Sequence, residues 1–232
     1  MLYRITLKQL SEIVGPVTAN TLFGAFLTAY SSCMQISETE IRDIILSDLF
    51  PAGVLPVGVK DNHTLYNKVA PIKTTITMRT LIARNTGIDN VPNQLSAYTY
   101  NGRWEFYLST RLLDAQSVQK IIEVMLTFGI GKWRNCGKGH FRLINIEECD
   151  DVNRESQKIA LSNFVPTSDV DGITETGYTI RSAIATNGKK QQSVCMLLSG
   201  TKLITKDNCI GDHIYDKTSD TYIHGKAILL EG

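Results

Sequence analysis

The chain has 232 residues, of which 43% are hydrophobic and 20% charged, and its net charge is +1. This composition is ordinary for a globular protein, and the length suits one large domain or two small ones. No apolar run reaches the ~18 residues that cross a bilayer, and the N-terminal MLYRITLKQL alternates like a strand rather than a signal peptide. We therefore predict no membrane association.

The five cysteines indicate neither a zinc site nor a disulfide framework, because they are scattered and form no C-x-x-C pair. Free thiols are typical of reducing compartments, so we predict a cytoplasmic protein. The acidic cluster at residues 147–151 has no partner histidine and is interpreted as a solvated link. We expect no metal ion and no cofactor.

Charge is distributed unevenly although the total is close to zero. Residues 60–84 contain five cations against one acid, whereas residues 143–176 contain eight acids against two cations. Such segregation predicts a basic face and an acidic face.

The first elements in the chain are predicted to be a strand and two helices. Residues 2–8 alternate apolar and polar side chains, the period of a half-buried strand. Residues 22–30 then carry an apolar stripe at helical spacing, and Asn20 and Thr21 stand at its start as candidate caps. The sequence SETE at 37–40 is a capping box for a second, short helix.

Residues 60–95 form a basic excursion that interrupts this order. The alternation over residues 72–82 predicts a strand. A long insertion of this kind more often has a function than a purely structural role. Residues 97–100 and 103–109 follow, joined by Asn101-Gly102, a pair typical of a type I′ turn. We therefore predict a hairpin between those two segments.

A further helix leads to the most distinctive stretch of the chain. Asp114 precedes apolar residues that recur at helical spacing over 118–126, and Gly129 stands where a helix-ending glycine is expected. We also predict five strands in the C-terminal part of the chain, at residues 158–165, 176–186, 194–205, 210–215 and 222–230.

Residues 129–140 (GIGKWRNCGKGH) form what we call the glycine loop. Its four glycines bracket three cations, one tryptophan and one histidine, without an acid. Outward N–H groups can form an anion-binding nest, and flat side chains can stack on bases. Five residues rather than four separate Gly131 from Gly137, and Gly139 follows Lys138, so this is not a nucleotide-hydrolysing phosphate loop. A loop that holds a phosphate backbone and a plain turn both fit the composition.

Residues 1–146 together give the order strand, helix, strand, strand, helix, strand, which is that of ferredoxin-like (RRM-like) modules. Residues 147–156 form a polar link. Residues 157–232 are strand-rich without good helices. We therefore predict an α+β protein with a ferredoxin-like module at 1–146, interrupted at about 60–95, and a degenerate strand-rich module at 157–232.

Several stretches resemble motifs of the repeat-associated (RAMP) superfamily of CRISPR proteins. The glycine loop has that superfamily's G-x-G-basic-x₄-G-x-G pattern between the second helix and the last strand of the module. Further similar segments are TLFGA at 21–25, LSDLFP at 46–51, LP at 55–56, RNTG at 84–87, LSNFVP at 161–166, LLSG at 197–200 and HGK at 224–226. Asp89-Asn90 departs from the family, which usually has a more basic thumb there.

This ordered set is similar to the subunit that caps the five-prime end of the guide RNA (crRNA) in type III-A (Csm) effector complexes. The resemblance implies a non-catalytic subunit that binds the repeat-derived five-prime handle of the crRNA. It also implies two protein partners, the large polymerase-like (cyclase) subunit and the backbone RAMP subunit. The excursion at about 60–95 then corresponds to a thumb hairpin that wedges the RNA.

The candidate RNA-binding residues lie in three places. Those of the glycine loop are Gly129, Gly131, Lys132, Trp133, Arg134, Asn135, Gly137, Lys138, Gly139 and His140. Those of the first helix start and the thumb are Asn20, Thr21, Lys73, Arg79 and Arg84. The loop cations are expected to contact phosphates and Asn135 a base edge, while Trp133 either stacks on a base or anchors the loop in the core.

Two alternatives stay open. Some relatives cleave precursor crRNA without a metal, using a histidine near a lysine, and His140 with Lys138 could act in that way. The chain could also be a scaffold in which protein contacts dominate. The other histidines, His63, His213 and His224, share no ligand spacing and are predicted to lie in turns or on the surface.

Overall fold

The structure, a computed structural model, describes residues 1–68, 72–80, 92–149, 154–168, 170–183 and 188–231. It is an α+β fold rich in strands, which confirms the predicted class. Its helices are α1 (Ala19–Cys33), α2 (Glu38–Asp43) and α3 (Ala115–Phe128), with a 3₁₀ turn at Arg134–Cys136. None of the described helices is long and apolar enough to cross a membrane.

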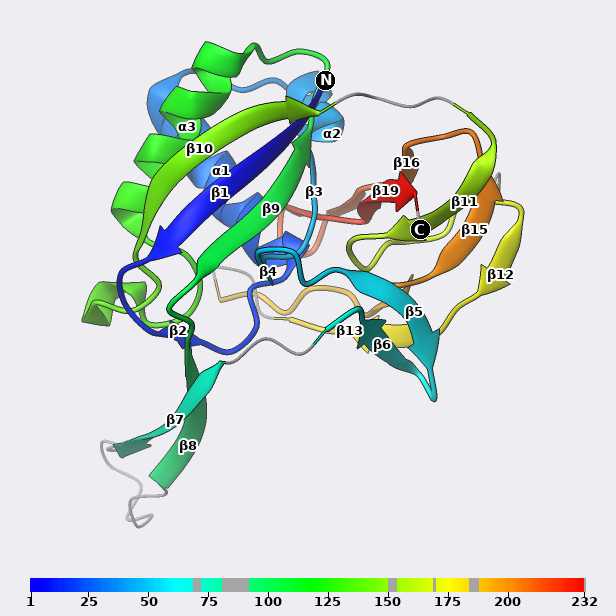
Figure 1. Cartoon of the computed structure of the whole chain (residues 1–232). Helices are drawn as coiled ribbons and strands as arrows, with labels where there is room; N and C mark the ends of the chain where they lie inside the picture. Colours follow the sequence, from blue (N-terminus) through cyan, green and yellow to red (C-terminus); the bar gives the residue numbers. More distant parts are fainter. Residues whose placement is uncertain (69–71, 81–91, 150–153, 169, 184–187, 232) are drawn as a thin grey trace.

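The strands fall into an N-terminal group and a C-terminal group (Figure 1). The first group is β1 (Leu2–Gln9), β2 (Ile13–Val14), β3 (Ile45–Leu46), β4 (Phe50–Pro51), β5 (Pro56–Lys60), β6 (His63–Tyr66), β7 (Lys73–Thr80), β8 (Pro92–Thr99), β9 (Arg103–Ser109) and β10 (Phe141–Cys149). The second is β11 (Ser156–Ala160), β12 (Ile173–Glu175), β13 (Tyr178–Arg181), β14 (Val194–Leu197), β15 (Lys202–Thr205), β16 (Cys209–Gly211), β17 (Ile214–Asp216), β18 (Thr221–Ile223) and β19 (Lys226–Glu231).

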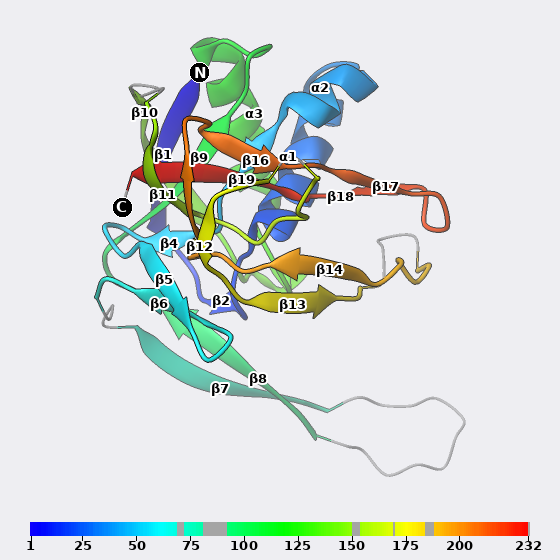
Figure 2. The ribbon, with the colours of Figure 1, turned by 90° about the vertical axis from the view of Figure 1, so that its right-hand side faces the viewer.

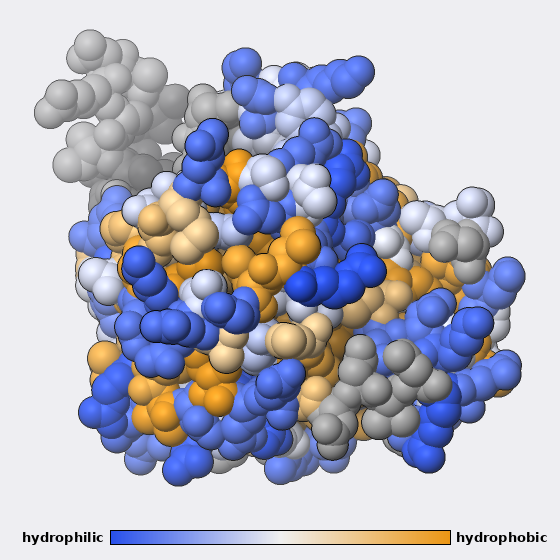
Figure 3. Space-filling model, turned by 90° about the horizontal axis from the view of Figure 1, so that it is seen from above, coloured by the Kyte–Doolittle hydropathy of each residue, from blue (hydrophilic) through white to orange (hydrophobic). Residues whose placement is uncertain are grey.

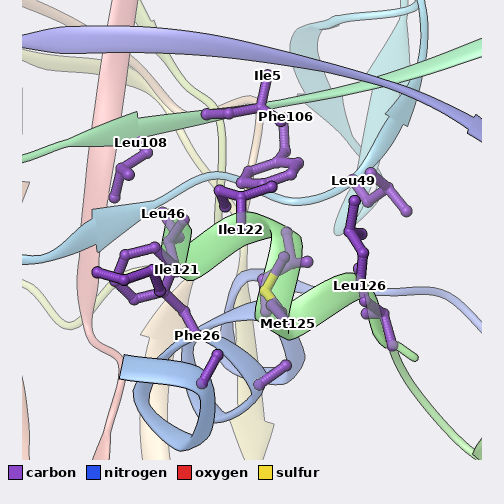
Figure 4. Close-up of a cluster of buried hydrophobic side chains, with 14 of the residues drawn as sticks. Ile5, Phe26, Leu46, Leu49, Phe106, Leu108, Ile121, Ile122, Met125 and Leu126 are labelled. Carbon is purple, nitrogen blue, oxygen red and sulfur yellow. The ribbon is translucent and has the colours of Figure 1, made fainter. Parts of the chain in front are cut away.

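The first sheet has the order β10-β1-β9-β3, with β4 also paired to β9, and all of these pairs are antiparallel. Helices α1 and α3 cover one face of it (Figure 1). The main core lies between them, where Ile5 and Phe106 from the sheet meet Phe26 of α1 and Ile122 of α3 (Figure 4). The strand alternation and the helical stripe both direct apolar side chains to this layer.

The helix ends follow the sequence signals in two cases and depart from them in the third. The capping box of α2 is present, and the Asp114 carboxylate accepts from the Ser117 N–H at 2.8 Å to cap α3. Helix α1 has no local side-chain cap. Asp48, beyond α2 in the sequence, supplies one instead, because its Oδ1 accepts from the Ala19 N–H at 2.6 Å.

The predicted hairpin between residues 97–100 and 103–109 is wrong. β8 pairs with β7 along its length and with β2 at its end. β9 has no edge left for β8, because β1 fills one side and β3 and β4 fill the other. The β7–β8 hairpin instead projects away from the body of the molecule (Figure 1, Figure 2). The Asn101-Gly102 turn thus connects two sheets.

The C-terminal group forms a second sheet of order β12-β15-β11-β19-β16, beside the pairs β13–β14 and β17–β18. It packs against the uncovered face of the first sheet through a buried apolar cluster. Tyr107 and Leu2 contribute from the first sheet, and Leu161 and Ile228 from the second group. The boundary between modules at residues 147–156 stays a prediction.

Two buried histidines join the C-terminal group to α1 and β3, so their predicted place at the surface is wrong. His213 is 4% exposed and His224 is fully buried. Their rings lie 4.9 Å apart and both pack on Phe23 of α1. His224 Nε2 accepts from the Leu46 N–H at 3.0 Å. His213 Nδ1 accepts from the Gly225 N–H at 3.2 Å, so Nε2–H donates to the Ile44 carbonyl at 2.9 Å.

These histidines should make stability depend on pH. Burial lowers the pKa of His213 to about 4 and that of His224 well below its usual value. The unfolded chain therefore takes up protons near pH 6.5 that the folded chain refuses, so the free energy of unfolding is highest above pH 6.5 and falls toward pH 4. We expect His213 to account for about 3 kcal/mol of that fall. Urea unfolding at steps across this window measures it.

His213→Leu should flatten this dependence, while His63→Gln, at an exposed position on β6, should leave it unchanged. Equal slopes for wild type and His213→Leu would contradict the role given to the buried pair.

Candidate nucleic-acid interface

The glycine loop is a compact turn fastened to the segment after β1. The Ile130 N–H donates to the Gly139 carbonyl and the Gly139 N–H to the Glu12 carbonyl, both at 2.8 Å. Trp133 and Gly137 are both left-handed, with φ of 61° and 76°, and frame the 3₁₀ turn. The backbone N–H groups of residues 136–140 are all used in such internal bonds. The backbone N–H groups of this half of the loop are therefore not available to an anion.

A cleft of about 790 Å³ opens beside the loop. One wall is formed by the loop with Gly131, Lys132 and Arg134, and another by α1 between Asn20 and Thr28. The C-terminal group forms the third wall. Its lining residues are Arg181, Gln191, Asp220, Thr221 and Tyr222. The structure therefore brings five of the predicted residues to one cleft, namely Asn20, Thr21, Gly131, Lys132 and Arg134.

Arg181 is a cleft residue that sequence reasoning missed. Its Nη1 donates to Gln191 Oε1 at 2.9 Å, and Gln191 Nε2 donates to Thr221 Oγ1 at 2.8 Å. This chain of hydrogen bonds fixes the position of the guanidinium. Partial burial lowers the pKa of Arg181 from its ordinary value. Since β13 shows only ordinary alternation, no local signal marks this arginine.

Three cations line the cleft, Lys132, Arg134 and Arg181. The ion pairs found in the described part of the chain do not include Lys132, Arg134 or Arg181. Asp220, the one acid in the lining, instead accepts a hydrogen bond from the Tyr215 hydroxyl. A partly desolvated guanidinium without a carboxylate is costly unless an anion reaches it. This arrangement suits a polyanion.

Other predicted residues have structural partners. Asn20 uses both amide atoms on the backbone of His224, donating to its carbonyl at 3.2 Å and accepting from its N–H at 3.0 Å. Lys138 forms an ion pair with Glu12, away from the cleft. The His140 N–H donates to Ser11 Oγ at 2.9 Å. Trp133 is half-buried and Asn135 is exposed.

The thumb candidates lie elsewhere. Lys73 is exposed at the foot of the β7–β8 hairpin, where it lines a separate hollow with Gln9 and Glu12. Arg79 lies in β7, and Arg84 lies outside the described residues. No group of three or more histidine, cysteine, aspartate or glutamate side chains suited to a metal occurs among the described residues.

No protein-family model and no curated protein match the sequence. Solved structures do match the fold. A chain of the Csm3–Csm4 subcomplex of the type III-A CRISPR–Cas interference complex matches with a TM-score of 0.70 and 14% identity, covering 100% of this chain and 99% of that one. A chain of the Csm1–Csm4 cassette with AMPPNP gives 0.60 and 13%, covering 99% and 97%. A chain of the type III-B Cmr-beta complex bound to cognate target RNA gives 0.54 and 11%, covering 87% and 86%.

These identities show a shared fold. The resemblance to type III CRISPR subunits that the sequence motifs indicated is thereby confirmed at the level of the fold, over the full chain. Csm4 is the subunit common to the first two structures.

The loop geometry makes one glycine far less replaceable than another. A Cβ on Gly139 would lie 1.9 Å from the Ile130 carbonyl oxygen, whereas one on Gly137 meets nothing within 4 Å. Both have positive φ, at 68° and 76°, so both alanine variants bear a conformational cost of about 1 kcal/mol. Gly139→Ala should lose a further 1–3 kcal/mol, roughly, from the clash. Urea unfolding compares the two variants, and equal losses would contradict the described loop closure.

Proposed function

We propose that this chain is an RNA-binding structural subunit of a type III-A CRISPR interference complex and that it caps the five-prime handle of the crRNA. One observation carries the proposal: Lys132 and Arg134 of the glycine loop and Arg181 of the C-terminal group line a single cleft, and none of the three forms an ion pair with a described residue. Single-stranded RNA is held through its phosphates by such grooves.

The architecture supports the proposal. We infer that the first sheet is a ferredoxin-like module, because β10-β1-β9-β3 reads as the fourth, first, third and second strands of that fold, with α1 and α3 as its helices. Elements β4 to β8 are inserted between the second and third strands. We further infer that the projecting β7–β8 hairpin is the thumb that contacts the RNA (Figure 2).

For the partners, we propose the large polymerase-like subunit and the first copy of the backbone subunit. Structural relatives occur in crystals with Csm3 and with Csm1, which supports contacts on more than one side of this fold. Figure 3 shows hydrophobic patches separated by hydrophilic side chains on one face of the molecule, a mixture common to protein–protein interfaces. Cytoplasmic location is part of the same proposal.

We propose a binding role and no catalysis. A metal-free ribonuclease of this type would need His140 and Lys138 to converge on one ribose hydroxyl. Lys138 is instead engaged by Glu12, and neither residue lines the cleft. The geometry therefore supports phosphate binding by residues 131–134 and an anchoring role for Lys138.

Loss of either loop cation should weaken binding of single-stranded RNA and reduce its salt dependence together. Lys132→Ala and Arg134→Ala should each weaken binding several-fold and lower the slope of log affinity against log salt by about 0.7, the value for one phosphate contact. Fluorescence anisotropy over a salt series measures both quantities. Lys120→Ala, on the exposed side of α3, is the matched control. Affinity that ignores salt, or an equal effect of Lys120→Ala, would mean that RNA is not held here.

The absence of catalysis is tested with a repeat RNA incubated with the wild-type chain in EDTA. We expect the RNA to remain intact, and His140→Ala to behave identically. A product that forms with the wild type and disappears with both His140→Ala and Lys138→Ala would establish the ribonuclease instead.

A further inference from the structure

A second hollow, of about 560 Å³, lies at the foot of the β7–β8 hairpin. Its volume is typical of small-molecule sites. The lining is mostly apolar and includes four aromatic residues from four different elements, Phe50, Tyr66, Tyr98 and Trp104. Tyr66 is 48% exposed and packs edge-on against Phe50, at 6.4 Å between ring centroids. Part of the Tyr66 side chain is therefore open to a ligand.

This hollow adjoins the cationic cleft. Gly15 and Pro16 line both cavities, so a single stretch of backbone separates the two. An RNA strand whose phosphates contact Lys132 and Arg134 can therefore place one base in the neighbouring hollow, across the backbone of Gly15 and Pro16. Bases that leave the stack commonly find aromatic side chains in RNA-binding proteins.

The polar residues of the lining are Thr18, Thr64, Lys68 and one carboxylate, Asp48. Asp48 lines it, and its Oδ1 accepts from the Ala19 N–H. Its Oδ2 accepts no hydrogen bond from the described residues. Burial raises the pKa of Asp48 to about 7, and burial together with the nearby Asp48 carboxylate raises the pKa of Tyr66 to about 12. Above pH 7 the hollow thus offers an acceptor beside an aromatic face.

Resting on the function proposed above, we propose that this hollow binds one unstacked cytosine of the RNA, with its ring on Tyr66 and its exocyclic amino group donating to Asp48. The acceptor favours cytosine over uracil, because carboxylates accept from the cytosine amino group, whereas uracil presents a carbonyl oxygen at the same position. A protein segment would also fill an apolar hollow, but the backbone that this hollow shares with the cationic cleft favours an RNA base.

The test uses the full chain, oligocytidylate and oligouridylate of equal length, and anisotropy at pH 8. We expect wild type to bind oligocytidylate about fivefold more tightly. Tyr66→Ala should weaken both by about tenfold, while Tyr178→Ala, an exposed tyrosine outside the hollow, should change neither. Asp48→Asn keeps a carbonyl for Ala19 but presents an amide donor to the base, so it should abolish or reverse the preference. Thermal unfolding verifies that each variant is folded.

The outcomes separate this inference from the proposed function. Salt-dependent RNA binding that shows no cytosine preference and is indifferent to Tyr66→Ala would overturn the nucleobase site and leave the cationic cleft standing. Loss of all salt-dependent binding, in wild type as well, would overturn both.

Discussion

The cleft depends on one buried junction, at which the C-terminal strands are fastened to α1 and β3. His224 accepts a hydrogen bond from the Leu46 N–H, and His213 donates one to the Ile44 carbonyl. From α1, the Asn20 amide forms two hydrogen bonds with the backbone of His224. Phe23 packs against both rings. Because these contacts are buried, they fix how far Arg181 stands from the glycine loop, and with it the width of the cleft.

Different residues of the glycine loop shape the turn and line the cleft. Gly129 ends α3 and Gly139 lets the chain pass against Ile130, so these two glycines shape the turn. Lys138 is held by Glu12 and fixes the loop to the segment after β1. Of the three loop cations, only Lys132 and Arg134 line the cleft, and neither forms an ion pair with a described residue. The rigid base keeps the two cations in place before an anion arrives, which lowers the ordering cost of binding.

Local chemistry made much of this fold predictable from sequence. The caps at Ser37 and Asp114, the helix-ending Gly129 and the alternation of β1 all depend on residues close in the chain. Features that depend on distant partners were not predictable. Residues 97–100 look like a hairpin arm, yet β9 already has neighbours on both edges. His213, His224 and Arg181 acquire their roles only when the C-terminal strands dock.

The central claim is that RNA lies between the two halves of the chain, and cross-linking tests it most directly. Single-stranded repeat RNA carrying 4-thiouridine is irradiated with the full chain, and the attached peptides are located by mass spectrometry. The account predicts cross-links on both walls, within residues 131–135 and within 188–191 or 220–222. Cross-links confined to one half of the chain, or to surfaces outside the cleft, would contradict it.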